Sequence, residues 1–270
     1  MDNRPIGVFD SGLGGLTALK ELIEIMPHED FIYFGDTGRI PYGTKSSETV
    51  IKYTRQDINF LKTFDIKGIL AACGTASSVA LPAIKNEFDI PIYGVVESAC
   101  IAAVKATKNN KIGILGTATT IKSKSYERVL LSLKKDIQVF SVACPMFVPI
   151  VENGYFSKDD AVANIIVKDY LRDLKINDVD TIILGCTHYP LLSDVIKNHI
   201  NDNIVLINSG KESADNLAKN ILKNDKCCEN KKGIVRFYVS DTVESFSKTA
   251  QIFLGSKVTN NVKKIDIENF

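Results

Sequence analysis

The sequence lacks a surplus of either charge: 33 lysines and arginines stand against 32 aspartates and glutamates, for a formal net charge of +1. A protein that binds duplex nucleic acid generally needs a basic surplus to displace counterions, so we expect no nucleic-acid partner. No apolar run approaches the roughly 18 residues of a membrane span, and the first ten residues carry no apolar signal-peptide core. These absences predict a soluble, cytoplasmic protein with no membrane partner.

Metal-binding and disulfide patterns are missing as well. The six cysteines include no Cys-x-x-Cys pair, Cys227 and Cys228 are adjacent, and the chain has only three histidines, which argues against zinc. Disulfide frameworks are typical of short secreted chains, whereas this chain has 270 residues. We therefore expect reduced thiols and no bound metal, with Cys100, Cys144, Cys227 and Cys228 as structural or surface residues.

The sequence does have a recurring unit, in which a short β-branched run precedes a stretch with helical spacing. Nearly continuous apolar runs are typical of parallel strands covered on both faces by helices, so the predicted fold class is α/β. Helical spacing is clearest in Leu13–Met26 and Val50–Phe64, and Ser157-x-x-Asp160 and Asp241-x-x-Glu244 resemble helix starts. The expected strands are Ile6–Asp10, Phe31–Gly35, Gly68–Cys73, Ile92–Val96, Lys111–Gly116, Ile137–Val142, Thr181–Cys186, Val205–Asn208 and Ile234–Val239.

Two of these strands end in cysteine, at corresponding places in two halves of the chain. Cys73 comes 63 residues after Asp10, where the first strand ends, and Cys186 comes 70 residues after Gly116, where the fifth ends. The pattern suggests two similar domains. Because ligands bind beyond the carboxyl ends of parallel strands, two such ends facing one another would form a cleft with one thiol on each wall.

The neighbours of these two cysteines favour chemistry over burial in a core, which remains the alternative. A strand-to-helix turn with small hydroxyl residues adds hydrogen-bond donors and the positive end of a helix, an environment that lowers the pKa of a thiol. A histidine next to such a thiol is a candidate acid or base. The residues that follow the two cysteines are Gly74, Thr75 and Ser77 in the first half, and Thr187, His188 and Tyr189 in the second.

Other turns carry weaker signals. The glycine-rich turn Asp10–Gly15, with Asp36 after the next strand, invites a dinucleotide site, but Gly-x-Gly-x-x-Gly would need glycine where Thr17 stands. A tight turn is a second reading, and a small anion such as a carboxylate at the helix N-terminus is the reading that we favour. Glu152 lies in a loop with Pro149 and Gly154, where a solvated charge is the alternative.

Taken in order, five motifs resemble those of the glutamate racemase family over about residues 5 to 254. They are Asp10-Ser-Gly-Leu-Gly-Gly, Pro41-Tyr-Gly, Ala72-Cys-Gly-Thr-Ala, Val95-Val-Glu and Gly185-Cys-Thr-His. The resemblance implies two pseudo-symmetric α/β domains, 1–97 plus 208–270 and 98–207, with the active site between them. It also implies cofactor-independent interconversion of L- and D-glutamate, which supplies D-glutamate for bacterial peptidoglycan, and it allows a homodimer.

Residue by residue, the resemblance makes Cys73 and Cys186 the two acid/base groups, with Asp10 assisting the first and Glu152 and His188 assisting the second. The family usually has asparagine after the first cysteine, whereas this chain has Gly74 and so lacks a side-chain amide toward the substrate. The substrate contacts implied are Asp10, Ser11, Pro41, Tyr42, Gly43, Gly74, Thr75, Thr187 and His188.

Three alternatives to this function remain at the level of sequence. An aspartate racemase would use the same pair of thiols, but such enzymes typically carry an acidic residue where His188 stands. A non-catalytic protein that binds a small anion would leave both cysteines structural. A dithiol redox protein would need the two sulfurs within disulfide reach, which a substrate-sized gap prevents.

Overall fold

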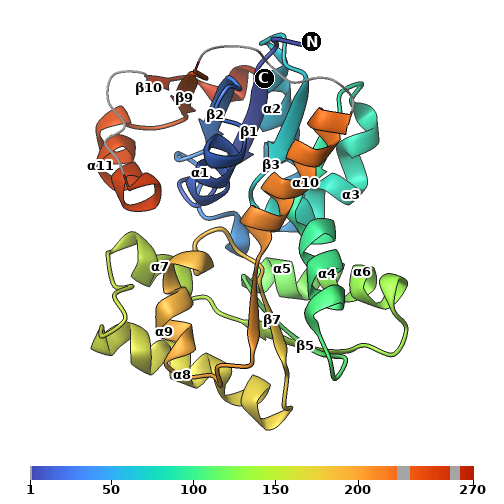
Figure 1. Cartoon of the computed structure of the whole chain (residues 1–270). Helices are drawn as coiled ribbons and strands as arrows, with labels where there is room; N and C mark the ends of the chain where they lie inside the picture. The colour runs from blue at the N-terminus through green and yellow to red at the C-terminus, as the bar shows by residue number, and fades with distance from the viewer. Residues whose placement is uncertain (1, 224–231, 256–261) are drawn as a thin grey trace.

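The computed structural model describes residues 2–223, 232–255 and 262–270, which form two parallel sheets flanked by helices (Figure 1). The larger sheet has the strand order β10-β9-β2-β1-β3-β4, and the smaller has β6-β5-β7-β8. The strands of the larger sheet are β1 (Ile6–Asp10), β2 (Phe31–Gly35), β3 (Gly68–Ala71), β4 (Ile92–Gly94), β9 (Val235–Val239) and β10 (Val262–Lys264). Those of the smaller sheet are β5 (Lys111–Gly116), β6 (Gln138–Ala143), β7 (Thr181–Leu184) and β8 (Val205–Asn208).

Helices cover the faces of both sheets, as the apolar strands require. They are α1 (Leu16–Ile25), α2 (Ser47–Lys62), α3 (Leu81–Ile84), α4 (Val95–Ala106), α5 (Ala118–Ser123), α6 (Ser125–Leu133), α7 (Phe147–Glu152), α8 (Ala161–Ile176), α9 (Ser193–Lys197), α10 (Ser209–Lys223) and α11 (Val243–Leu254). Short 3₁₀ turns or a π-helical turn occupy Tyr42–Thr44, Ala76–Ala80, Lys85–Glu87, Tyr189–Leu192 and Ile267–Asn269. The predicted α/β class is confirmed.

The strand register explains where polar residues gather. Every residue of β1 is buried, and Phe9 pairs with Phe34 of β2 on one side and Ala71 of β3 on the other. All strand pairs among the described residues are parallel, so the carboxyl ends of neighbouring strands lie at the same edge. Asp10 and the turn after β3 therefore meet at one edge of the larger sheet.

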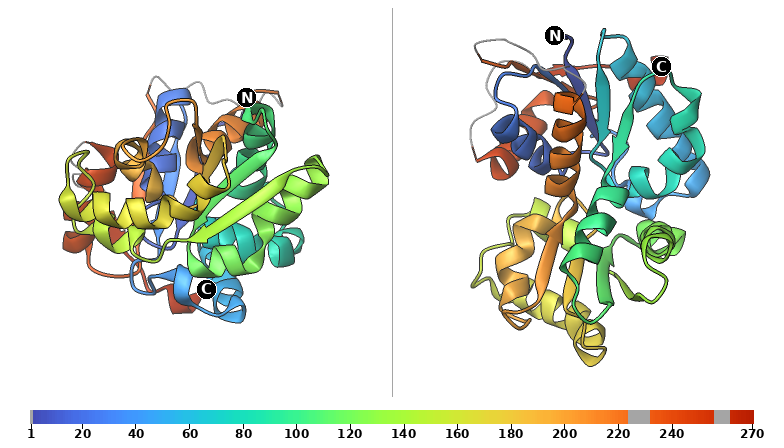
Figure 2. Two further views of the ribbon diagram at one scale, coloured as in Figure 1. Left: turned by 90° about the horizontal axis from the view of Figure 1, so that it is seen from below. Right: turned by 45° about the vertical axis from the view of Figure 1, so that its right-hand side comes forward.

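The chain passes between the two sheets twice. After β4 it runs through α4 into β5, and after β8 it runs through α10 back toward β9. These two helices pack against each other, and α10 also packs against α1. Figure 2 shows the two sheets one above the other, joined by this pair of crossings. The carboxyl ends of strands from both sheets consequently face the space between them.

Three strands end earlier than the sequence predicts. β3 stops at Ala71 and β7 at Leu184, so Cys73 and Cys186 each lie two residues beyond a strand instead of ending it. The predicted strand Ile92–Val96 stops at Gly94, because α4 begins directly at Val95. The placement matters, since a residue beyond the strand can direct its side chain across the sheet edge.

Both helices predicted from capping patterns begin at other residues than the sequence indicates. The helix after Ser157 begins at Ala161, where the Asp160 carboxylate accepts the backbone N–H of Ala163 at 2.9 Å and caps it. The helix after Asp241 begins at Val243, and its cap residue, Thr242, makes no side-chain capping bond. Cys227 and Cys228, which we expect from the sequence to be structural or surface thiols, lie outside the described residues.

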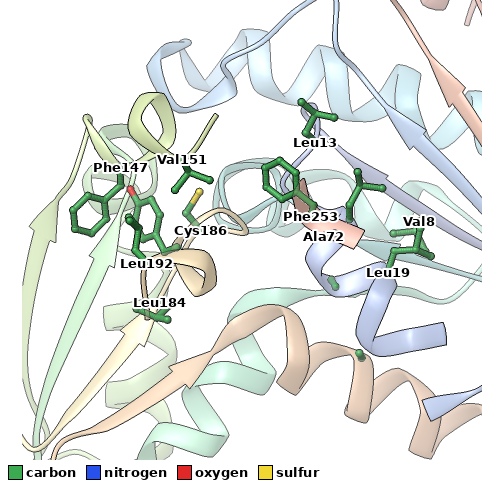
Figure 3. Close-up of a cluster of buried hydrophobic side chains, with 14 of the residues drawn as sticks. Val8, Leu13, Leu19, Ala72, Phe147, Val151, Leu184, Cys186, Leu192 and Phe253 are labelled. Carbon is green, nitrogen blue, oxygen red and sulfur yellow. The ribbon is translucent and has the colours of Figure 1, made fainter. Parts of the chain in front are cut away.

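Apolar packing is continuous between the two sheets. One cluster of buried side chains includes Val8 and Leu19 of the larger sheet's layers, together with Leu184 and Cys186 of the smaller. Figure 3 shows Phe253, from α11, lying between these two groups. The second cysteine is therefore part of this packed core. Among the described residues, no helix is both long and apolar enough to cross a membrane.

Candidate active site

A cavity of about 390 Å³ lies between the carboxyl ends of the two sheets, and both candidate thiols line it. A volume of this size suits a small molecule. The larger sheet contributes Ser11, Gly12, Ile40, Pro41, Tyr42, Gly43, Thr44, Cys73, Gly74 and Thr75. The smaller sheet contributes Thr117, Ala118, Cys144, Pro145, Val148, Pro149, Glu152, Asn153, Cys186, Thr187 and His188.

The first thiol is held at the start of the turn after β3. Its sulfur donates to the Ser11 hydroxyl at 3.6 Å and accepts the backbone N–H of Ala76 at 3.5 Å. Burial and then the charge of Asp10 raise the pKa of Cys73 to about 12. The expectation that its turn lowers the pKa of this thiol was wrong, because those two effects outweigh the donors. In this state Cys73 is a protonated thiol.

Asp10 lies behind the cavity wall and does not line it. The backbone N–H of Gly12 donates to Oδ2 at 2.9 Å, and the Thr187 hydroxyl donates to Oδ1 at 3.5 Å. Burial raises the pKa of Asp10, although His188 and two backbone N–H groups oppose the shift. Among the described residues no hydrogen bond joins Asp10 to Cys73, so Asp10 acts on that thiol through its charge.

The second thiol belongs to a chain of three groups. The Cys186 sulfur lies 3.8 Å from Nδ1 of His188, and Nε2 of the same imidazole lies 2.9 Å from Oε1 of Glu152. Burial lowers the pKa of His188, but Cys186 and Glu152 outweigh burial and raise it to about 10. At neutral pH the imidazole is thus protonated and has one N–H for each partner. The Phe253 ring packs nearly perpendicular to the imidazole, with centroids 5.4 Å apart.

The glycine-rich turn after β1 packs against the second thiol's loop. A Cβ on Gly14 would lie 2.2 Å from the Thr187 hydroxyl oxygen and 2.4 Å from Nδ1 of His188. The Thr17 hydroxyl donates to the Thr187 carbonyl at 3.0 Å. Close approach between the two sheets thus requires this glycine.

A similar close approach occurs at Gly74. A Cβ there would lie 2.3 Å from the carbonyl oxygen of Gly185, the residue before the second thiol. That distance is far inside van der Waals contact. Gly74 therefore permits the backbones that carry the two thiols to approach each other, whereas a side chain at this position would push them apart.

Hydroxyl groups connect the two walls of the cavity. Thr119 of α5 donates to the carbonyls of Gly43 at 2.8 Å and Lys45 at 3.2 Å, and the hydroxyls of Thr75 and Thr117 lie 3.1 Å apart.

The sequence interpretation missed Thr117, although it follows β5 in the way that Ser11 follows β1. It also missed that Cys144, fully buried, lines the cavity.

Comparisons with known proteins agree with this geometry. The family model for Asp/Glu/hydantoin racemases matches residues 17–216, so the chain belongs to that family. The glutamate racemase of Thermoanaerobacter pseudethanolicus is 40% identical over 270 residues, covering all of both chains. Solved glutamate racemases are similar as well: that of Bacillus anthracis has a TM-score of 0.94, 38% identity and 98% coverage of both chains. That of Francisella tularensis in complex with D-glutamate has a TM-score of 0.93, 33% identity and full coverage of both.

An aspartate racemase of Picrophilus torridus shares the fold alone, with a TM-score of 0.58, 20% identity and coverage of 80% of this chain and 94% of its own. The resemblance drawn from the motifs is confirmed, and the comparisons favour the glutamate racemases over the aspartate enzymes.

Proposed function

We propose that the protein interconverts L- and D-glutamate by a two-thiol acid/base reaction, with Cys73 and Cys186 as the catalytic residues. The observation that carries the proposal is the cavity itself, whose lining includes Cys73 from the end of the larger sheet and Cys186 from the end of the smaller one. The small-molecule substrate is the acidic amino acid that the full-length relatives are named for. No cofactor enters the proposed reaction.

Racemisation removes the hydrogen from Cα and restores one on the opposite face. A base on one side and an acid on the other accomplish this without rotation of the substrate. The two thiols have unequal surroundings: Cys73 is a protonated thiol of high pKa, whereas Cys186 lies beside the protonated imidazole of His188. This arrangement suits Cys186 as the base toward L-glutamate and Cys73 as the acid, with the roles exchanged for D-glutamate.

The α-proton of an amino acid is very weakly acidic, so the developing carbanion needs stabilisation. In this proposal, cavity hydroxyls and backbone N–H groups supply the donors, from Ser11 and Thr75 on one wall and from Thr187 on the other. In this proposal Asp10 assists Cys73, while Glu152 and His188 assist Cys186. Pro41, Tyr42 and Gly43 contact the substrate from the larger sheet's side, together with Gly74.

The proposal also includes the domain division of the enzyme, the use of its product, its location and its assembly. Residues 1–97 with 208–270 and residues 98–207 form two domains, each of which contributes one of the two catalytic thiols. The product D-glutamate supplies bacterial peptidoglycan synthesis, and the enzyme acts in the cytoplasm. A homodimer is the assembly that we propose for it in solution.

The deciding experiment incubates purified protein, with no added cofactor, separately with L-glutamate and L-aspartate. Loss of optical rotation with L-glutamate and not with L-aspartate is the expected result. Racemisation of aspartate alone would contradict the substrate. Binding of glutamate with no loss of rotation would indicate a binding protein in place of an enzyme. In that case, titration of the thiols with and without glutamate would show no pair of thiols that the substrate protects.

A further inference from the structure

A cluster of buried polar side chains lies behind the cavity loop Ile40–Thr44. The Tyr42 hydroxyl lies 2.5 Å from Oδ2 of Asp36 and 2.9 Å from Oδ2 of Asp57, a residue of α2. Arg39 bridges the same two carboxyl groups, with Nε 2.7 Å from Asp36 and a terminal nitrogen 3.2 Å from Asp57. The side chains of Asp36 and Asp57 are completely buried. None of these groups was assigned from the sequence as part of this cluster.

Counting hydrogens shows that the cluster holds an extra proton. A phenol has one hydrogen to donate, so Tyr42 can donate to one carboxyl oxygen and must accept from the other. An ionised carboxylate has no hydrogen to give. One of the two oxygens facing Tyr42 therefore carries a proton.

The partners of each oxygen place that proton on Asp57. Oδ2 of Asp36 accepts from Arg39 as well as from Tyr42, and Oδ1 accepts the Ser240 hydroxyl at 2.8 Å. Both oxygens of Asp36 are thus occupied as acceptors. Oδ1 of Asp57 accepts from Arg39, which leaves Oδ2 as the oxygen that donates to Tyr42.

Charge balance supports the same assignment. The charged groups that act on Asp57 are Asp36 and Arg39 from the turn after β2 and Asp10 at the end of β1. Glu268, near the C-terminus, is half exposed and shares Arg39. With Asp57 neutral, the Arg39 cation matches the Asp36 anion; with Asp57 ionised, a second buried negative charge would need compensation. Burial and the Asp36 charge accordingly raise the pKa of Asp57 well above its ordinary value.

The cluster is attached to the substrate cavity through one residue. Tyr42 is buried and belongs to the loop whose neighbours Pro41 and Gly43 line the cavity, while its hydroxyl points away into the cluster. We propose that Asp57 is a positioning residue that carries a proton at neutral pH and, through Tyr42, holds the loop Ile40–Thr44 in place for substrate binding. The kinetic part of this inference rests on the proposed function.

The proton itself can be tested without any activity. Above about pH 4, the unfolded chain ionises Asp57 while the folded chain keeps it neutral, so this residue destabilises the fold as pH rises. Asp57→Asn cannot lose a proton. We expect the unfolding constant of the wild type, divided by that of Asp57→Asn, to rise with pH from about pH 5 through neutral pH in urea titrations, at a rate that approaches tenfold per pH unit. A ratio independent of pH would overturn the protonated assignment.

The positioning role is tested by splitting KM from kcat. Asp57→Ala removes the donor to Tyr42 and should raise KM for glutamate about five- to tenfold, as a lost hydrogen bond allows, with kcat changed less than about twofold. Asp57→Asn, which keeps a donor, should stay within about twofold of the wild type. The matched control is Thr54→Val, one turn earlier in α2, because the buried Thr54 hydroxyl finds no hydrogen-bond partner among the described residues.

Three results would overturn the positioning role: an unchanged KM in Asp57→Ala, an equal loss in Asp57→Asn, or the same change in Thr54→Val. A wild-type protein that does not racemise glutamate would instead contradict the proposed function, and the urea titrations would still decide where the proton lies. Calorimetric titration with D-glutamate then replaces KM as the measure of substrate binding. The two failures are therefore distinguishable.

Discussion

Replacing Gly74 by alanine adds one carbon at a point where the backbones carrying the two thiols come close together. That carbon would start 2.3 Å from the Gly185 carbonyl oxygen, so the two backbones must separate by about 1 Å to restore contact. A misplacement of this size at a reacting centre costs about 100-fold in rate, or about 2.7 kcal/mol of activation free energy. Overpacking should also lower the free energy of unfolding by about 1–3 kcal/mol.

The assay is kcat/KM in both directions by circular dichroism, together with urea unfolding. Gly68→Ala, on the strand β3 that precedes the turn with Gly74, is the matched control, because its new Cβ would lie 3.6 Å from the nearest atom, an ordinary contact. We expect it to keep full activity. Gly74→Asn should behave like Gly74→Ala, although it restores the amide that the family usually has. A Gly74→Ala protein with wild-type kcat/KM and stability would refute the close-approach argument, and a lower KM in Gly74→Asn would support a missing substrate contact instead.

Three further predictions concern the proposed acid/base groups. Cys73→Ala and Cys186→Ala should each abolish racemisation with native circular dichroism, and more than a few per cent of residual activity would remove that thiol from the mechanism. In heavy water, mass spectrometry at low conversion should find deuterium in the D-glutamate formed and little in the remaining L-glutamate; unlabelled product would exclude a two-base reaction. Glu152→Gln should lower the pKa of His188 from about 10. A raised histidine pKa stabilises the fold below about pH 6.5 and this contribution is lost as pH rises to about 10, so the wild type should lose about 1–2 kcal/mol more than the variant over that range, measured with urea. Parallel curves of stability against pH for the two proteins would contradict the effect of Glu152 on the pKa of His188.

The sequence predicted nine of the ten strands that the structure describes, because parallel strands buried on both faces leave an apolar pattern that a single chain displays. It missed β10, whose residues Val262–Lys264 include two exposed lysines. The positions of Cys73 and Cys186 followed from the same pattern, since each cysteine ends the apolar run, although the strands themselves stop two residues earlier. Strand ends were less accurate at Gly94, where a helix begins in the next residue and Val95 and Val96 are as apolar as the strand before them.

The electrostatics of the site could not be predicted in the same way. Neighbours along the chain suggested a lowered thiol pKa at Cys73, but burial and Asp10, 63 residues away in sequence, raise it. Asp57 gave no signal either, because a carboxylate in an amphipathic helix is typical of a solvent-exposed face. Only the folded chain brings it to Tyr42 and Asp36. Thr117 was accessible to sequence reasoning, since its place after β5 mirrors that of Ser11 after β1.

The surroundings of the two thiols differ greatly, but thermodynamics limits how far this difference can affect the rates of the two directions. One sulfur meets Ser11 and the Ala76 N–H, and the other meets the His188–Glu152 pair. Enantiomers have equal free energies in water, so an enzyme that interconverts them must have the same kcat/KM in both directions, however unlike its two walls are. Unequal walls can make kcat and KM differ between the two directions, but only in proportion, so that kcat/KM stays the same in both. A mutation confined to the His188 wall will therefore slow both directions of the reaction by the same factor at low substrate concentration, while the two maximal rates are free to diverge.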